Sequence, residues 1–185
     1  MIHNPDILEK LKKGNETYLS AVANPGDVSP AIRKDTTVNG QHPYAIVVCC
    51  SDSRVVPEAV FSTGIGEIFT IRVAGNVINN TQLGSIQYAA GHLGCKVIIV
   101  LGHTHCGAVG ASLQGGGHGY VKFLTDEIIA NIGGEKDEYK ASCINAQKGV
   151  EKIKTALAED KESLTETTDV LGAIYDIESG KVEFL

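Results

Sequence analysis

Residues 44–54, YAIVVCCSDSR, join a short apolar run to a group of polar and reactive side chains. The run from Tyr44 is rich in Val and Ile and does not alternate with polar residues, which is typical of a strand buried on both faces of a parallel sheet. Two further runs of this kind follow, EIFTIRVA from Glu67 and KVIIVLG from Lys96. The chain therefore contains three predicted strands of one central sheet.

Helical patterns separate and follow these strands. Residues 81–94 place apolar side chains at steps of three and four, as a crossover helix packed on a sheet does, and the same spacing from Cys143 to Leu157 predicts a second amphipathic helix. The chain closes on two strand-like pieces around a Ser179–Gly180 turn. This order predicts an α/β fold, with a mainly parallel central sheet flanked by helices and a C-terminal edge strand.

The N-terminal segment is predicted to form a helix followed by a loop. Asn4 is predicted to cap a helix whose first position is Pro5, and this helix is an arm or a covering helix. Residues 24–43 are rich in turn-forming residues and are predicted to be an extended loop. Because the chain shows no internal repeat and no domain boundary, we predict a single domain over residues 1–185, in which residues 1–40 form the helical arm and loop.

Composition excludes several classes of function. The formal net charge of −6 and the absence of a Lys/Arg-rich face argue against a nucleic-acid binder. No run approaches the roughly 20 apolar residues that span a bilayer, and the N-terminal segment lacks the apolar centre of a signal peptide. We therefore expect a cytoplasmic protein with neither a nucleic-acid nor a membrane partner.

Cysteines and one histidine point to a metal site. An odd number of cysteines, five, in a reducing compartment favours buried thiols or metal ligands over a disulfide framework. Cys50 follows the first predicted strand, while His103 and Cys106 follow the third, and ligands gather at the carboxyl ends of parallel strands. Two thiolates and an imidazole would hold Zn²⁺ and leave its fourth position open, as catalytic zinc sites do. The remaining cysteines are predicted to pack in the core: Cys49, Cys95 and Cys143.

Asp52 and Arg54 lie beside the first of these thiols. Asp52 is placed to accept a hydrogen bond from a zinc-bound hydroxide, and Arg54 is placed to pair with Asp52 and keep it ionised. A single cysteine usually packs in a core, and a lone His-x-x-Cys pair is a weak signal. Five matching residues at two strand ends that the fold brings together indicate a catalytic site much more strongly.

These residues carry a resemblance to a known family. The motifs CSDSR at 50–54 and GHTHCG at 102–107 closely resemble those of the β-class carbonic anhydrases. The similarity continues through GEIFTIRVAGNVI at 66–78 and through the C-terminal GAIYDIESGKVEFL. It covers most of the chain from Gln41 to Leu185.

The resemblance implies a zinc lyase that catalyses the reversible hydration of carbon dioxide to bicarbonate and a proton. It implies that Cys50, His103 and Cys106 bind the zinc, and that Asp52 and Arg54 orient the metal-bound nucleophile. One alternative on the same scaffold is hydrolysis of carbon disulfide or carbonyl sulfide. Another is a zinc-binding protein without catalysis, although a purely structural site has no need of Arg54.

Three further residues match the plant-like branch of that family, in which two subunits share a substrate pocket. Gln41, Phe69 and Tyr88 stand where that branch has a glutamine, an aromatic residue and a tyrosine, and Tyr88 lies off the apolar stripe of its helix. Gln41 would donate an amide N–H to a substrate oxygen, and the two rings would form apolar walls suited to a small gas; simple packing of the rings is the alternative. The resemblance thus implies a homodimer or larger homo-oligomer, with Asp52 off the metal at neutral pH and above.

Overall fold

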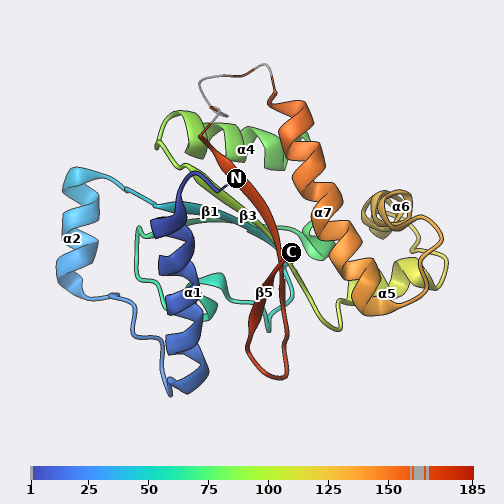
Figure 1. Cartoon of the computed structure of the whole chain (residues 1–185), viewed down its shortest axis with the longest axis horizontal. Helices are drawn as coiled ribbons and strands as arrows, with labels where there is room; N and C mark the ends of the chain where they lie inside the picture. Colours follow the sequence, from blue (N-terminus) through green and yellow to red (C-terminus); the bar gives the residue numbers. More distant parts are fainter. Residues whose placement is uncertain (1, 159, 161–164, 166) are drawn as a thin grey trace.

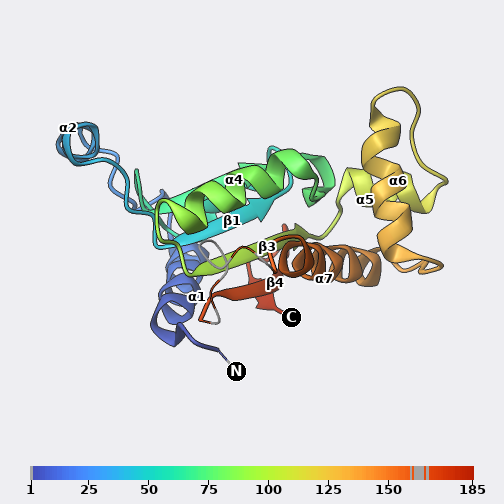
Figure 2. The ribbon, with the colours of Figure 1, turned by 90° about the horizontal axis from the view of Figure 1, so that it is seen from above.

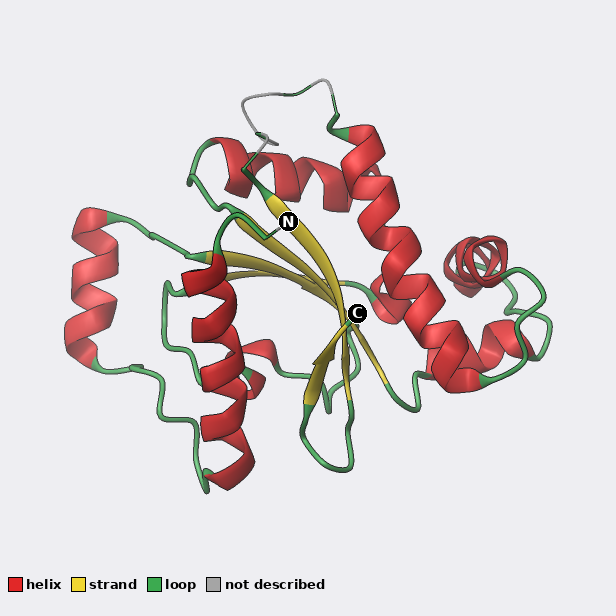
Figure 3. Ribbon diagram, in the orientation of Figure 1, coloured by secondary structure: helices red, strands yellow, loops and turns green. Residues whose placement is uncertain are grey.

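The computed structural model describes residues 2–158, 160, 165 and 167–185. Its centre is a five-stranded sheet in the order β2-β1-β3-β4-β5 (Figure 1, Figure 3). The first four strands are parallel, and β5 pairs antiparallel to β4. The strands are β1 (Ala45–Cys49), β2 (Ile68–Arg72), β3 (Val97–His103), β4 (Asp169–Tyr175) and β5 (Val182–Phe184). The predicted fold class is confirmed, including its C-terminal edge strand.

The two central strands explain why their sequences lack alternation. Every residue of β1 and of β3 is buried, because each strand has a neighbour on both sides and helices over both faces. Successive side chains therefore enter two separate cores. In β1, for example, Ile46 and Val48 belong to one core while Val47 and Cys49 belong to the other. A strand of this kind needs apolar residues at all positions.

Four helices cover the two faces of the sheet: α1 (Pro5–Ser20), α3 (Pro57–Val60), α4 (Asn80–Gly91) and α7 (Glu138–Ala156). On one face α4 and α7 contribute Ile86 and Ile153 to the core, which confirms both predicted amphipathic helices. On the other face α1 and α3 contribute Leu11 and Val60, so α1 is a covering helix. Figure 2 shows β1 between α4 and α1.

Beyond the carboxyl ends of the strands lies a third, smaller core. It is built by a short 3₁₀ helix and two α-helices: η1 (Ala74–Asn76), α5 (Gly107–Leu113) and α6 (Val121–Ile132). Its buried residues include Cys50, Cys106 and Ile128. Two of the predicted metal ligands therefore sit in an apolar cluster rather than at the open surface.

The predicted loop over residues 24–43 is wrong in its middle, where α2 (Pro30–Asn39) forms. Ser29 caps this helix by accepting a hydrogen bond from the N–H of Ile32 at 3.3 Å, and proline takes the first helical position. Ser followed by Pro is a helix-start signal, which the surrounding turn-formers concealed. None of the residues of α2 is buried, and the helix stands apart from the body of the chain (Figure 1, Figure 2).

The start of α1 at Pro5 is confirmed, but the predicted cap is not. The side chain of Asn4 makes no capping hydrogen bond and instead donates to the carbonyl of Thr167 at 2.6 Å and to Asp169 Oδ2 at 2.9 Å. The N–H groups of His3 and Asn4 also donate to the Asp169 carboxylate. Burial raises the pKa of Asp169, but these hydrogen bonds outweigh burial and lower it. The N-terminal segment is thus tied to the start of β4.

Within the residues that the structure describes, no helix has both the length and the apolar character needed to cross a membrane.

Candidate metal centre

Two neighbouring parallel strands bring the predicted metal ligands together. Cys50 follows the last residue of β1, His103 is the last residue of β3, and Cys106 precedes the first residue of α5. Because β1 and β3 pair in parallel, their carboxyl ends meet at one edge of the sheet. One ligand atom from each of the three residues lies within 4.8 Å of the other two. The site that sequence motifs predicted is assembled by the fold.

The imidazole of His103 has one ring nitrogen, Nε2, that is available to a metal ion. The residue is fully buried, and its Nδ1 lies 2.9 Å from the Thr104 carbonyl, which can only accept a hydrogen bond. Nδ1 therefore carries the proton, and Nε2 carries a lone pair. Nε2 is buried and has no hydrogen-bond partner in the described part of the chain. An unpaired buried nitrogen is costly, and a metal ion at this position would satisfy it.

The thiols of Cys50 and Cys106 change each other's pKa. A hydrogen bond from Cys106 lowers the pKa of Cys50, against the effect of burial, and the same contact together with burial raises the pKa of Cys106. Two adjacent buried thiolates repel each other, so a divalent cation is the partner that lets both ionise. Cys50 Sγ also accepts hydrogen bonds from the N–H of Gly75 at 3.2 Å and of Asp52 at 3.4 Å. The donor set of two sulfurs and one imidazole fits zinc.

Asp52 and Arg54 form a two-pronged ion pair beside this cluster. Arg54 Nε donates to Oδ1 at 3.0 Å, and Nη2 donates to Oδ2 at 2.7 Å. The Arg54 backbone N–H donates to Oδ1 as well, at 2.9 Å. The Arg54 side chain, with its hydrogen bonds, holds the pKa of Asp52 well below its usual range. The carboxylate is ionised, and both of its oxygens are engaged by the guanidinium.

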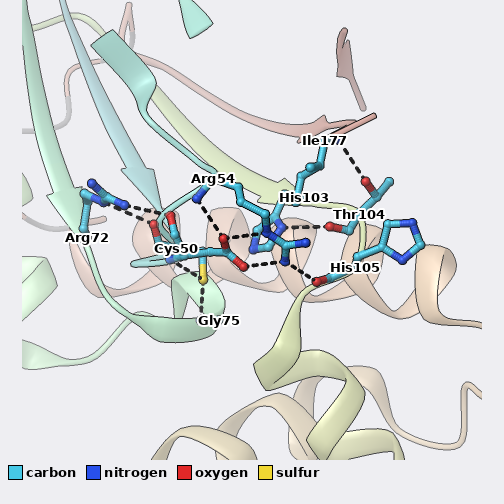
Figure 4. A network of polar contacts seen from close by, with 9 residues as sticks. Cys50, Arg54, Arg72, Gly75, His103, Thr104, His105 and Ile177 are labelled. Carbon is cyan, nitrogen blue, oxygen red and sulfur yellow. Dashed lines mark hydrogen bonds and ion pairs between the residues drawn. The ribbon is translucent and has the colours of Figure 1, made fainter. Parts of the chain in front are cut away.

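Two arginines join the loops that carry the ligands. Arg54 Nη2 donates to the carbonyl of His105 at 3.0 Å, which links the loop after β1 to the loop after β3. His105 has a φ of +54°, an uncommon value for a residue with a side chain. Arg72 donates to the carbonyl of Cys50 at 3.3 Å and to that of Asp52 at 2.9 Å (Figure 4). The two guanidinium groups therefore hold the backbone on either side of the cluster.

Sequence reasoning missed the contribution of Arg72 and of Gly75 to the site. Arg72 is the last residue of β2 and Gly75 lies just after it, so both are more than 20 residues from Cys50. They reach it through strand pairing, since Arg72 is the register partner of Cys49. A signal was present, since Arg72 lies near the end of the predicted strand EIFTIRVA and Gly75 follows that strand directly. Their targets are backbone and sulfur atoms, which side-chain motifs do not reveal.

The predicted substrate residues do not line the metal cluster of their own chain. Gln41 precedes β1 and Cys50 follows it, so the length of this five-residue strand, about 16 Å at roughly 3.3 Å per residue, separates the two ends. Phe69 is the second residue of the edge strand β2 and pairs with Ile46, the second residue of β1. Tyr88 is 47% exposed on α4, and its ring centroid lies 6.2 Å from that of Phe69. The structure brings the two rings together, at a distance from the thiols.

Comparison with known sequences agrees with this geometry. The sequence profile of the family described as carbonic anhydrase matches residues 45–182. The carbonic anhydrase of Mycolicibacterium smegmatis is 34% identical over 187 residues, which cover 94% of this chain and 89% of that protein. Carbonic anhydrase 2 of Mycobacterium tuberculosis is 37% identical over 128 residues, 66% of this chain and 61% of that protein.

Solved structures show the same fold. The β-carbonic anhydrase CafA of Aspergillus fumigatus superimposes with a TM-score of 0.74 and 26% identity, over 84% of this chain and 81% of that chain. The β-carbonic anhydrase CcaA gives a TM-score of 0.67 and 26% identity, over 99% and 91%. Since sequence, fold and a zinc-type donor set agree, this chain belongs to the β-carbonic anhydrases, the zinc-dependent lyases that interconvert carbon dioxide and bicarbonate.

Proposed function

We propose that Cys50, His103 and Cys106 bind the catalytic zinc of this enzyme and that Asp52 and Arg54 form its orienting pair. The observation that carries the proposal is the buried, unpartnered Nε2 of His103, which lies with two thiols in one cluster among the described residues. Zinc bound there would supply Lewis acidity, which would make hydroxide available near neutral pH for attack on carbon dioxide.

The residues around the metal have separate tasks. The ionised Asp52 accepts a hydrogen bond from the attacking oxygen and so directs its lone pair at the substrate carbon. Arg54 holds both carboxylate oxygens and would thereby keep Asp52 from binding the metal directly. The hydrogen bond from His103 Nδ1 to the Thr104 carbonyl orients the imidazole. We infer from this arrangement that Asp52 is paired with Arg54 and is not a ligand of the metal.

Stopped-flow measurement of carbon dioxide hydration at pH 7 and pH 8.5 tests the function. The zinc-loaded protein is expected to hydrate carbon dioxide, to lose this activity when a chelator removes the metal, and to regain it when zinc is returned. Activity on carbon disulfide or carbonyl sulfide alone would instead identify a sulfur-gas hydrolase. A zinc-loaded protein inactive on all three gases would be a zinc-binding protein without catalysis.

We further propose that the working form is a homodimer or a larger homo-oligomer. Gln41, Phe69 and Tyr88, the residues of the plant-like branch, lie away from their own metal cluster and would complete the pocket of a second copy. An isolated helix as short as the ten-residue α2 is unstable in water, yet none of its residues is buried and Val38 is 74% exposed. A second copy would cover it. One structural relative, from Sordaria macrospora, is described as a tetrameric β-carbonic anhydrase.

Val38→Glu is expected to weaken this assembly, because it replaces the exposed apolar side chain that a second copy would cover with a charge. Sedimentation velocity should show a shift towards the monomer, and hydration per chain should fall in parallel while zinc content stays constant. The matched control is Thr37→Glu, which adds the same charge about 100° around the helix. A Val38→Glu monomer with full activity would show that the pocket lies within one chain.

The remaining assignments are also proposals. All five cysteines are free in the structure, which supports a reducing compartment such as the cytoplasm. The net charge of −6 supports a small-molecule enzyme without a nucleic-acid partner. Residues 1–185 are proposed to act as one domain.

A further inference from the structure

The sulfur of Cys50 accepts a hydrogen bond from a backbone N–H in the segment that follows β2. Gly75 belongs to η1, and its N–H lies 3.2 Å from Cys50 Sγ (Figure 4). Gly75 has a φ of +71°, a conformation that glycine adopts without strain. A Cβ atom at this position would lie 2.6 Å from Ile128 Cδ1 and 3.0 Å from Ala108 Cβ. The N–H reaches the sulfur because residue 75 has no side chain.

The other side of Gly75 is held by an asparagine from α7. Asn145 Nδ2 donates to the Gly75 carbonyl at 2.9 Å, and Asn145 is only 2% exposed. Asn145 Oδ1 accepts a hydrogen bond from Asn131 Nδ2 of α6, also at 2.9 Å. Because the Gly75 carbonyl can only accept, the nitrogen end of the Asn145 amide must face it, which leaves Oδ1 for Asn131. A chain of hydrogen bonds therefore runs from α6 through α7 and η1 to the sulfur of Cys50.

We propose that Asn145 is a positioning residue of the metal centre: it anchors Gly75 so that the Gly75 N–H donates to the Cys50 sulfur. The proposal rests on the proposed role of Cys50 as a zinc ligand. An N–H···S hydrogen bond draws charge from a thiolate, so the metal keeps more of its Lewis acidity. This matters in a site where two of the three protein ligands are thiolates. Without Asn145, Gly75 is free to turn its N–H away, because glycine adopts a wider range of backbone conformations than any other residue type.

Asn145→Ala tests this role through metal binding rather than activity. The zinc dissociation constant, measured by competition with a chromophoric chelator, is expected to rise about tenfold. In the cobalt(II)-substituted protein, the sulfur-to-metal charge-transfer band is expected to move to lower energy, because the sulfur has lost a hydrogen-bond donor. A residue that only stabilised the fold would lower the melting temperature and leave both quantities of the folded protein unchanged.

Ser142→Ala is the matched control. Ser142 lies on the same helix, is equally buried at 2% exposure, and its Oγ has no hydrogen-bond partner among the described residues. Its replacement is expected to leave the zinc affinity and the cobalt spectrum at their wild-type values. The comparison separates an effect of the hydrogen-bond chain from a general effect of altering α7.

A folded Asn145→Ala protein with wild-type zinc affinity and cobalt spectrum would overturn the proposal. If that variant does not fold, Asn131→Ala takes its place at a half-buried position, and a smaller shift in the same direction is expected; no shift would be equally decisive against it. Cys50→Ser tests separately whether Cys50 is a zinc ligand. If it binds zinc as tightly as wild type, the assignment of Cys50 as a ligand fails, whatever Asn145 does.

Discussion

Replacing His103 by alanine is expected to abolish zinc binding and to reduce carbon dioxide hydration on the order of 10⁴-fold or more. The imidazole is the one nitrogen donor of the cluster, and its Nε2 is buried with no other hydrogen-bond partner among the described residues. Without it, two adjacent thiols remain, and these favour sharing a proton over ionising together. Zinc content by mass spectrometry and hydration by stopped flow measure the two losses.

Two further variants make the His103 result interpretable. His103→Gln fills more of the buried space than alanine does, so a common loss in both variants reflects the missing ligand rather than a cavity. His118→Ala removes an exposed histidine from the loop between α5 and α6 and is expected to retain one zinc per chain and full activity. Stoichiometric zinc and substantial hydration in a folded His103→Ala protein would refute the proposed ligand set.

Asp52→Asn is expected to lower kcat by about 10²–10³-fold while zinc content stays unchanged. The amide keeps the shape of the carboxylate but removes its charge, and its nitrogen can only donate. It therefore breaks half of the two-pronged contact with Arg54 and loses the strong acceptor that orients the attacking oxygen. Effects on stability are expected to be within about 1 kcal/mol, because half of the Arg54 side chain is exposed to solvent.

The loss caused by Asp52→Asn should not depend on pH between 7 and 8.5. Arg54 lowers the pKa of Asp52, so the carboxylate is ionised at every pH above its ordinary range and does not titrate in this interval. The matched control is Asp126→Asn, which breaks an exposed ion pair with Lys122 on α6 and is expected to leave kcat unchanged. Activity of Asp52→Asn equal to or above that of wild type would contradict the proposal, and is the result expected if Asp52 normally occupied the metal.

The arrangement of Asp52 and Arg54 also shows how local sequence becomes local geometry. The two residues are two positions apart, and the Arg54 N–H and guanidinium both reach the Asp52 carboxylate within this short turn. Their pairing needs little from the rest of the fold, which is why the Cys-x-Asp-x-Arg pattern could be interpreted directly. The contact from Arg54 to the carbonyl of His105 is different, because it depends on β1 and β3 being neighbours.

Segments with strong local signals were predicted correctly from the sequence. The apolar runs of β1 and β3 are buried throughout, and the amphipathic patterns of α4 and α7 correspond to helices on one face of the sheet. The errors occurred where local signals compete. Turn-forming neighbours hid the start of α2 at Ser29-Pro30, and Asn4 binds Asp169 at the start of β4 instead of capping its own helix.

The sequence by itself determined the class of the fold and the identity of the candidate metal ligands, because burial periodicity and reactive side chains are properties of short segments. Only the tertiary structure decided what surrounds those ligands. Arg72 and Gly75 reach Cys50 or its loop from 22 and 25 residues away, and Asn145 reaches Gly75 from 70 residues away, through strand register and helix packing. Their contacts are made by, or to, backbone groups that every residue possesses. No residue pattern encodes such contacts; they exist because the sheet and α7 place those backbone atoms within hydrogen-bonding distance.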